Sequence, residues 1–238
     1  MDSSTQMSDV RFTTIFLSNL TFNILLSKGE RWQYVILPLS PSKASAWSSS
    51  DMGSVGWVSS GGVIYNHLSS TDGSLAAYYE IETLDTCGGH SNEDMEYHYH
   101  LVSLLDLKLI NLWCFCIHSR ILILNFHQQI PYIYSSANNA SACEAIGYMK
   151  DGYPVYGRCT GSEEVELESC WTQIDGTDGD NEEDFSYDST DCYLDEVNGY
   201  TFSDGSYGYV LADNIFQTPI GYYGDEIGTA YGFTPSIA

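Results

Sequence analysis

The chain has few basic residues, and their position is as informative as their number. Only 8 of the 238 residues are Lys or Arg, against 32 Asp or Glu, and the formal net charge is −24. No base follows Arg158, whereas 18 acidic residues lie between Cys159 and the end of the sequence. Such a surface repels phosphate backbones and anionic lipid headgroups. We therefore expect no nucleic-acid partner and no binding to anionic membranes.

The sequence also lacks the common catalytic signatures. It contains no Gly-x-Ser-x-Gly elbow, no phosphate-binding loop and no dinucleotide fingerprint. Runs of Ala, Leu, Glu and Lys that favour helices are scarce. In contrast, 19 Tyr outnumber 9 Phe, and tyrosine suits half-buried pleated surfaces. We predict a mainly β protein, a compact domain of short Gly- and Tyr-rich strands and long loops.

The amino-terminal part differs in composition from the rest. We predict a leader and a serine-rich linker over residues 1–54, followed by the domain over residues 55–238. Phe12–Leu26 is apolar enough for a weak signal segment, although polar residues interrupt it. It is too short to span a bilayer. Ser40–Ser60 is rich in serine and is typical of a linker.

A long apolar stretch interrupts the predicted domain. Leu101–Phe126 contains neither Gly nor Pro, and its apolar residues form no amphipathic stripe. A membrane helix there would place Arg120 in the bilayer, at a cost of about 3 kcal/mol. Val102 with the following serine matches the residues that a eukaryotic splice donor encodes, and Gln129 matches an acceptor. We therefore interpret about Val102–Gln129 as a translated intron, with a genuine hydrophobic insert as the alternative.

The cysteines favour an extracellular or cell-surface location. The last four bracket loop-rich sequence and would form two disulfides in one of three pairings. The seven cysteines are Cys87, Cys114, Cys116, Cys143, Cys159, Cys170 and Cys192. Acceptor triplets at Asn19 and Asn139 predict a glycoprotein. The acidic loop Asp175–Asp184 resembles a calcium loop but lacks the glycine of an EF-hand, so it allows weak calcium binding at most.

An internal repeat joins two distant segments. Leu84–His100 aligns without gaps with Leu194–Val210, and six positions are identical. The potential ligands differ: every histidine and cysteine of the first copy is replaced in the second. We predict two related turn-strand units, of which only the first carries a site.

The candidate site lies in Cys87–His100. His98 and His100 alternate with Tyr97 and Tyr99, so on a strand both imidazoles point to one side. A Gly-Gly turn precedes His90 and would fold it back beside this pair. Three imidazoles and a thiolate suit zinc or copper.

We therefore predict a metal or small-ligand site formed by His90, His98, His100 and Cys87. The alternative is that the histidines form hydrogen bonds within a polar core. Tyr97 and Tyr99 accompany the site as further binding residues. Asp85 and Asp151 are candidates for a carboxylate that orients a ligating histidine.

These residues resemble those of the YHYH-domain family, whose name matches Tyr97-His98-Tyr99-His100. Three further segments are similar to family motifs: Gly61–Asn66, Leu84–His90 and Ile146–Gly157. The resemblance implies a mostly secreted domain without an established activity. In that family a shorter connection follows the YHYH string, which agrees with the intron interpretation.

Three hypotheses follow from the sequence. The first is a secreted binding module that holds a transition metal or a small ligand. The second is a metal-dependent, hydrolase-like enzyme in which Asp151 orients a ligating histidine. The third is a structural or surface interaction protein in which the histidines serve only the core.

Overall fold

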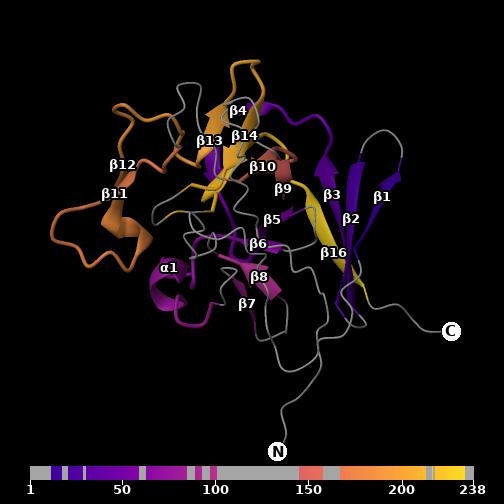
Figure 1. The fold of residues 1–238 in the computed structure, drawn as a ribbon, viewed down its shortest axis with the longest axis horizontal. Helices are drawn as coiled ribbons and strands as arrows, with labels where there is room; N and C mark the ends of the chain where they lie inside the picture. Colours follow the sequence, from indigo (N-terminus) through magenta and orange to yellow (C-terminus); the bar gives the residue numbers. More distant parts are fainter. Residues whose placement is uncertain are drawn as a thin grey trace, which may run out of the picture.

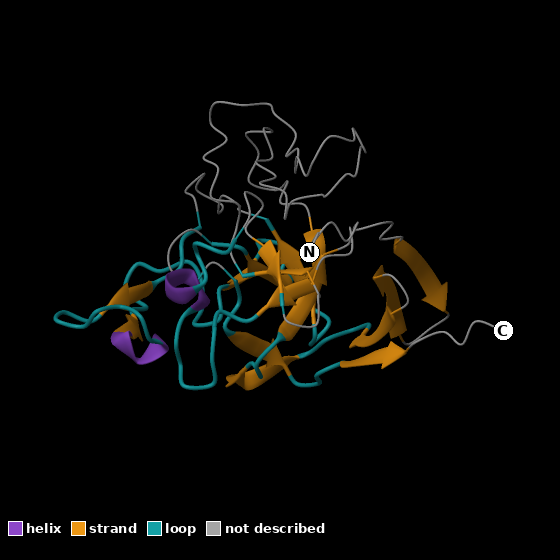
Figure 2. Ribbon diagram, turned by 90° about the horizontal axis from the view of Figure 1, so that it is seen from below, coloured by secondary structure: helices purple, strands orange, loops and turns teal. Residues whose placement is uncertain are grey.

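The computed structural model describes residues 12–17, 21–28, 31–58, 63–84, 89–92, 97–100, 145–157, 167–212, 216 and 218–233. These residues form a mainly β protein with several sheets and short helical turns, as the sequence predicts (Figures 1 and 2). No helix among them is both long and apolar enough to cross a membrane. The apolar stretch Leu101–Phe126 and the interval Val102–Gln129 lie outside the described residues, so the intron interpretation stays a prediction.

An eight-stranded sheet forms the centre of the molecule, in the order β13-β14-β10-β9-β5-β6-β8-β7. Its strands are β5 (Ser54–Val58), β6 (Val63–Tyr65), β7 (Gly89–Ser91), β8 (Tyr97–Tyr99), β9 (Ala145–Met149), β10 (Pro154–Tyr156), β13 (Gly199–Thr201) and β14 (Tyr207–Val210). Short strands agree with the frequent glycines, which interrupt β structure.

The two hairpins at the ends of this sheet have the same register. In β7–β8, Gly89 pairs with Tyr99 and His90 with His98. In β13–β14, Gly199 pairs with Tyr209 and Tyr200 with Gly208. The paired residues of the two hairpins are the same ones that the sequence repeat aligns with each other. The structure therefore confirms the two related turn-strand units.

The repeat extends to four strands on each side. Ile64 of β6 lies opposite Gly56 and beside Tyr99, and Val155 of β10 lies opposite Gly147 and beside Tyr209. The sheet is thus two copies of one unit, β5-β6-β8-β7 and β9-β10-β14-β13.

The copies meet symmetrically where β5 pairs with β9. Trp57 lies opposite Tyr148, its equivalent in the other copy. Gly147 allows this contact, because a Cβ there would lie 2.1 Å from the carbonyl oxygen of Trp57.

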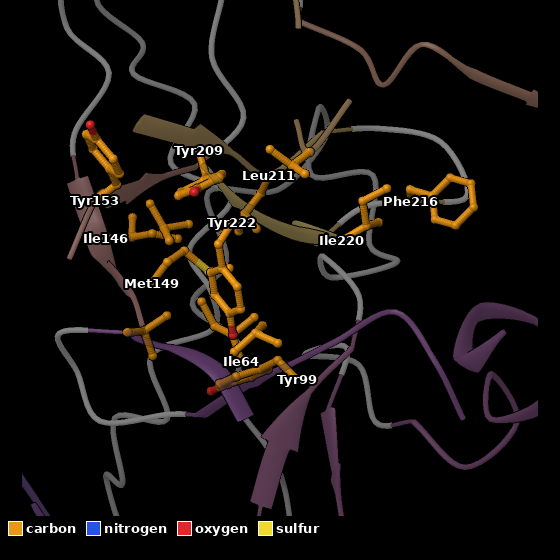
Figure 3. Close-up of a cluster of buried hydrophobic side chains, with 14 of the residues drawn as sticks. Ile64, Tyr99, Ile146, Met149, Tyr153, Tyr209, Leu211, Phe216, Ile220 and Tyr222 are labelled. Carbon is orange, nitrogen blue, oxygen red and sulfur yellow. The ribbon is translucent and has the colours of Figure 1, made fainter. Parts of the chain in front are cut away.

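Buried side chains from both units form the main core (Figure 3). Ile64 and Tyr99 come from the first unit, and Met149, Val155 and Tyr209 come from the second. Tyr99 is 3% exposed and Tyr209 is fully buried. Tyrosines therefore serve as core residues here.

The strands outside the central sheet connect the two ends of the chain. β1 (Phe12–Leu17), β2 (Thr21–Lys28) and β3 (Arg31–Pro38) form a sheet with β16 (Thr229–Phe233), and β4 (Lys43–Ser49) pairs with β15 (Gly221–Gly224). The first sheet lies to the right in Figure 1. The segment expected to be a linker thus contains β4 and β5. Exposed serines are compatible with β4 because it belongs to a sheet of only two strands.

A third peripheral element carries a disulfide and the acidic loop. β11 (Trp171–Gln173) and β12 (Phe185–Tyr187) form a hairpin, and Cys170 is bonded to Cys192. Cys143 and Cys159 lie outside the described residues. The loop between the strands contains the short 3-10 helix η2 (Glu182–Asp184).

Three acids of this loop lie close together, namely Asp178, Asp180 and Asp184. Asp184 Oδ2 accepts hydrogen bonds from the amides of Gly179 (3.1 Å) and Asn181 (3.2 Å), so this carboxylate already stabilises the loop itself. Calcium binding by this loop stays a prediction.

Candidate metal centre

The hairpin β7–β8 at the edge of the sheet brings the three histidines together. His90 and His98 are cross-strand partners, and their ring centroids are 4.6 Å apart. His98 and His100 point to the same side, with 3.1 Å between their Nε2 atoms. Gly89 permits the tight hairpin, because a Cβ there would lie 2.6 Å from the carbonyl oxygen of His98.

A carboxylate that sequence reasoning missed completes the cluster. Glu80 ends the short helix α1 (Ala76–Tyr79), which lies near β6, β7 and β8 in Figure 1. Its Oε2 is 3.0 Å from Nε2 of His90 and 3.2 Å from Nε2 of His100. One ligand atom from each of the four residues lies within 4.8 Å of all the others.

The cluster is partly open to solvent. His98 and His100 are buried, at 2% and 3% exposed. The side chains of His90 and Glu80 are 18% and 19% exposed. Burial alone would raise the pKa of Glu80, but hydrogen bonds from His100 and Ser69 and the nearby histidines lower it to about 2. Glu80 is therefore an anion under ordinary conditions.

Neighbouring groups hold the rings of two histidines. Nδ1 of His100 lies 2.8 Å from the carbonyl oxygen of Asn66, which can only accept, so this nitrogen carries the proton. The Thr83 hydroxyl donates to the carbonyl oxygen of Glu80 (2.7 Å) and lies 2.8 Å from Nδ1 of His90. Nε2 of both histidines faces the carboxylate of Glu80.

The cluster combines the donor atoms of a metal centre. Only 3.0–3.2 Å separates the carboxylate of Glu80 from Nε2 of His90 and of His100. Protons on the imidazoles satisfy these contacts in the absence of a metal, and a metal ion at the same place would satisfy them together. The contact between Nδ1 of His100 and a backbone carbonyl is typical of ligating histidines.

Aromatic rings support the buried side of the cluster. Tyr65 stacks on His98, with centroids 3.7 Å apart and planes inclined by 15°. The Tyr65 hydroxyl accepts a hydrogen bond from Asn92 (3.0 Å). Tyr99 belongs to the main core and Tyr97 packs against it. Along the YHYH string, the tyrosine rings thus face the core and the imidazoles face the cluster.

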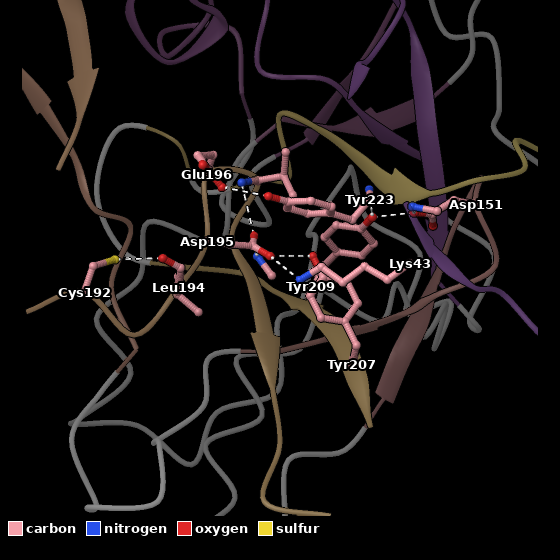
Figure 4. Close-up of polar contacts among 12 residues, drawn as sticks. Lys43, Asp151, Cys192, Leu194, Asp195, Glu196, Tyr207, Tyr209 and Tyr223 are labelled. Atoms are coloured by element: carbon pink, nitrogen blue, oxygen red, sulfur yellow. Dashed lines mark hydrogen bonds and ion pairs between the residues drawn. The ribbon is translucent and has the colours of Figure 1, made fainter. Parts of the chain in front are cut away.

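Cys87 and Asp85 lie outside the described residues, so their part in the site stays a prediction. Asp151 is in the turn between β9 and β10, in the other half of the sheet (Figure 4). Its carboxylate accepts hydrogen bonds from the Tyr209 hydroxyl and from the amides of Gly224 (2.9 Å) and Tyr153 (3.2 Å). Burial raises its pKa, and these hydrogen bonds oppose the rise.

The second unit has no such cluster at the equivalent place. Tyr200, Gly208 and Val210 replace His90, His98 and His100. Val210 and Tyr200 belong to an apolar cluster that also contains Tyr156, the equivalent of Tyr65. A Cβ on Gly208 would lie 2.5 Å from the ring of Tyr156. The ring therefore occupies space that the His98 side chain takes in the first unit.

The comparison with known families agrees with this structure. The model of the family described as YHYH protein matches residues 34–224, which include both copies of the unit and the histidine cluster. The chain belongs to the YHYH protein family. In this YHYH protein the matched region begins within β3 and therefore includes the serine-rich segment. No curated protein and no solved structure matches the chain.

Proposed function

We propose that this YHYH protein is a secreted binding module that holds a transition metal ion at His90, His98 and His100. The observation that carries the proposal is the convergence of three imidazoles and a carboxylate, whose ligand atoms all lie within 4.8 Å of one another. Nδ1 of His100 contacts the carbonyl oxygen of Asn66 and Nδ1 of His90 contacts the Thr83 hydroxyl, so Nε2 of both rings faces the cluster.

Burial of the cluster supports the same conclusion. A buried polar group destabilises a fold unless its partners satisfy it, and a buried charge does so more strongly. The second unit shows that the same four strands accept an apolar filling at this place. The histidines are therefore not needed to build the unit.

Secretion is supported by the disulfide between Cys170 and Cys192, since such bonds persist mainly in oxidising compartments. We propose binding rather than catalysis, because the enzyme hypothesis depended on Asp151. That carboxylate accepts hydrogen bonds from Tyr209, Gly224 and Tyr153, in the half of the sheet that lacks the histidines.

Metal titration of the purified protein tests the proposal. After removal of metal with a chelator, the protein is titrated with Zn²⁺ and with Cu²⁺, and bound metal is measured by mass spectrometry. We expect one ion per chain, and a loss of affinity of at least about tenfold in His98→Ala and His100→Ala. His67→Gln is the control, because His67 pairs with Glu182 outside the cluster. Equal metal content in all four proteins would reject the proposal.

A further inference from the structure

We infer that Glu80 is the fourth protein ligand of this ion, in place of Cys87, and that the site selects a divalent ion of the zinc type over cuprous copper. The inference depends on the proposed function, because it concerns the same ion. It goes further in naming the ligand set, the class of metal and the element that binding stabilises.

The distances around Glu80 fit direct ligation. Bonds of about 2.0–2.2 Å from zinc to nitrogen or oxygen place neighbouring ligands of a tetrahedral ion about 3.3–3.6 Å apart. Three separations between ligand atoms in the cluster are 3.0, 3.1 and 3.2 Å. They need to open by only a few tenths of an ångström, which side-chain rotations can supply.

The backbone holds Glu80 at this position independently of any ion. Its amide donates to the carbonyl oxygen of Ala76 (2.9 Å) and closes helix α1. Ala76 is fully buried and anchors the helix. The Thr83 hydroxyl donates to the carbonyl oxygen of Glu80 and contacts Nδ1 of His90, so one hydroxyl connects both prospective ligands. The carboxylate is thus prepared for binding.

The ligand set decides the class of metal. Three imidazoles and one carboxylate suit borderline divalent ions such as zinc, whereas soft thiolate and thioether ligands select cuprous copper. A carboxylate also neutralises one of the two positive charges of the ion. We therefore expect tight binding of Zn²⁺ and no preference for Cu⁺.

Ligation by Glu80 also has a mechanical consequence. The histidines belong to the β7–β8 hairpin and its end, whereas Glu80 belongs to α1. An ion held by all four residues connects the helix to the edge of the sheet. An ion held by the histidines alone, or by the histidines and Cys87, would leave the helix unconnected.

The test compares Glu80→Gln with Glu82→Gln and Cys87→Ser in the full chain. Glu82 is an exposed glutamate two residues away and serves as the matched control. Three measurements are made on each protein: Zn²⁺ affinity, the absorption spectrum of the Co²⁺ form, and hydrogen exchange at α1 with and without Zn²⁺. Circular dichroism confirms that each variant is folded.

We expect Glu80→Gln to lose at least about tenfold in Zn²⁺ affinity and the two other variants to stay within about threefold of the parent protein. The Co²⁺ form should lack a sulfur-to-cobalt charge-transfer band. Zn²⁺ should slow exchange at the amides of Tyr79 and Glu80 in the parent protein and not in Glu80→Gln.

The outcomes separate this inference from the proposed function. An undiminished affinity in Glu80→Gln, or a charge-transfer band that Cys87→Ser abolishes, would overturn the inference and leave a histidine metal site. A parent protein that binds neither Zn²⁺ nor Cu²⁺ would reject both.

Discussion

Replacement of Asp151 tests whether this residue serves the fold or the metal centre. Asp151 is fully buried and accepts hydrogen bonds from one hydroxyl and two amides, on Tyr209, Gly224 and Tyr153. Figure 4 shows it facing the hydroxyl of Tyr209. These bonds connect the β9–β10 turn to β14 and β15.

The magnitude follows from the donors that the substitution leaves unsatisfied. Each buried donor without a partner costs about 1–3 kcal/mol, so three donors set an upper range of about 3–9 kcal/mol for Asp151→Ala. Removal of a buried carboxylate relieves its desolvation, and a water molecule can replace part of the bonding. We therefore expect a loss of about 3–4 kcal/mol, or about 6–16 °C in Tm for a domain of this size.

Asp151→Asn should cost less, about 1–2 kcal/mol, because the amide keeps one acceptor but points a donor at another donor.

The pH dependence has a defined sign. Burial raises the pKa of Asp151, so its stabilising contribution is complete below the unfolded pKa and decreases as pH rises through the folded pKa. The difference between parent and Asp151→Asn should therefore be largest in acid and smaller at neutral pH.

Thermal unfolding followed by circular dichroism measures these differences. Asp188→Ala is the control, since Asp188 is exposed and its carboxylate accepts local hydrogen bonds from Thr190, whose amide lies 2.8 Å away. Zn²⁺ binding is measured on the same samples below the transition. An unchanged Tm in Asp151→Ala, or normal stability with impaired Zn²⁺ binding in Asp151→Asn, would refute the reasoning and favour a role beside the histidines.

Three further predictions concern the scaffold. Gly147→Ala should destabilise the protein by more than about 3 kcal/mol, because the new Cβ meets the backbone of Trp57. Gly56→Ala should cost less, because its new Cβ meets the flexible sulfur of Met149 as well as backbone. Equal denaturation midpoints for the two variants would contradict this. Replacing Cys170 and Cys192 by serine should cost about 3 kcal/mol through loop entropy in chemical denaturation, and an unchanged midpoint would argue against this pairing. Hydrogen bonding to His67 and its charge lower the pKa of Glu182 against the effect of burial, so its contribution is present above the unfolded pKa and is lost as pH falls through the folded one. Glu182→Gln should thus lower the free energy of unfolding by about 0.5 kcal/mol near neutral pH, a value reduced by solvent screening, and should not change it at about pH 3. A loss of stability that does not depend on pH would exclude the ion pair.

The sequence predicted those features that depend on local patterns. Alternation placed His98 and His100 on one side of a strand, and the gapless repeat identified the second hairpin. Glu80 could not be found in this way, because its approach depends on how helix α1 packs near the sheet edge and no spacing rule connects it to His90. Thr83 and Asn66 were missed for the same reason: each contributes a single hydroxyl or carbonyl group that becomes significant only in three dimensions.

Composition was least informative where pairing decides the structure. Ser40–Ser60 is rich in serine, yet β4 within it finds a partner in β15, far along the chain. Asp151 illustrates the same point, because a carboxylate beside a turn is equally compatible with a metal centre and with a buried hydrogen-bond network. Its surroundings of Tyr209 and Gly224 are distant in sequence, so only the fold could distinguish the two.

The duplicated sheet provides an internal control for the site. Both units have the same strand order and the same register, so the backbone makes equal demands on each. In the second unit, Val210, Gly208 and the ring of Tyr156 fill the equivalent place. An apolar filling is the less costly solution, since buried imidazoles and a carboxylate need partners that apolar groups do not. The first unit has the costlier solution, and Asn66 and Thr83 contact two of its imidazoles, which favours the proposal that the cluster binds a cation.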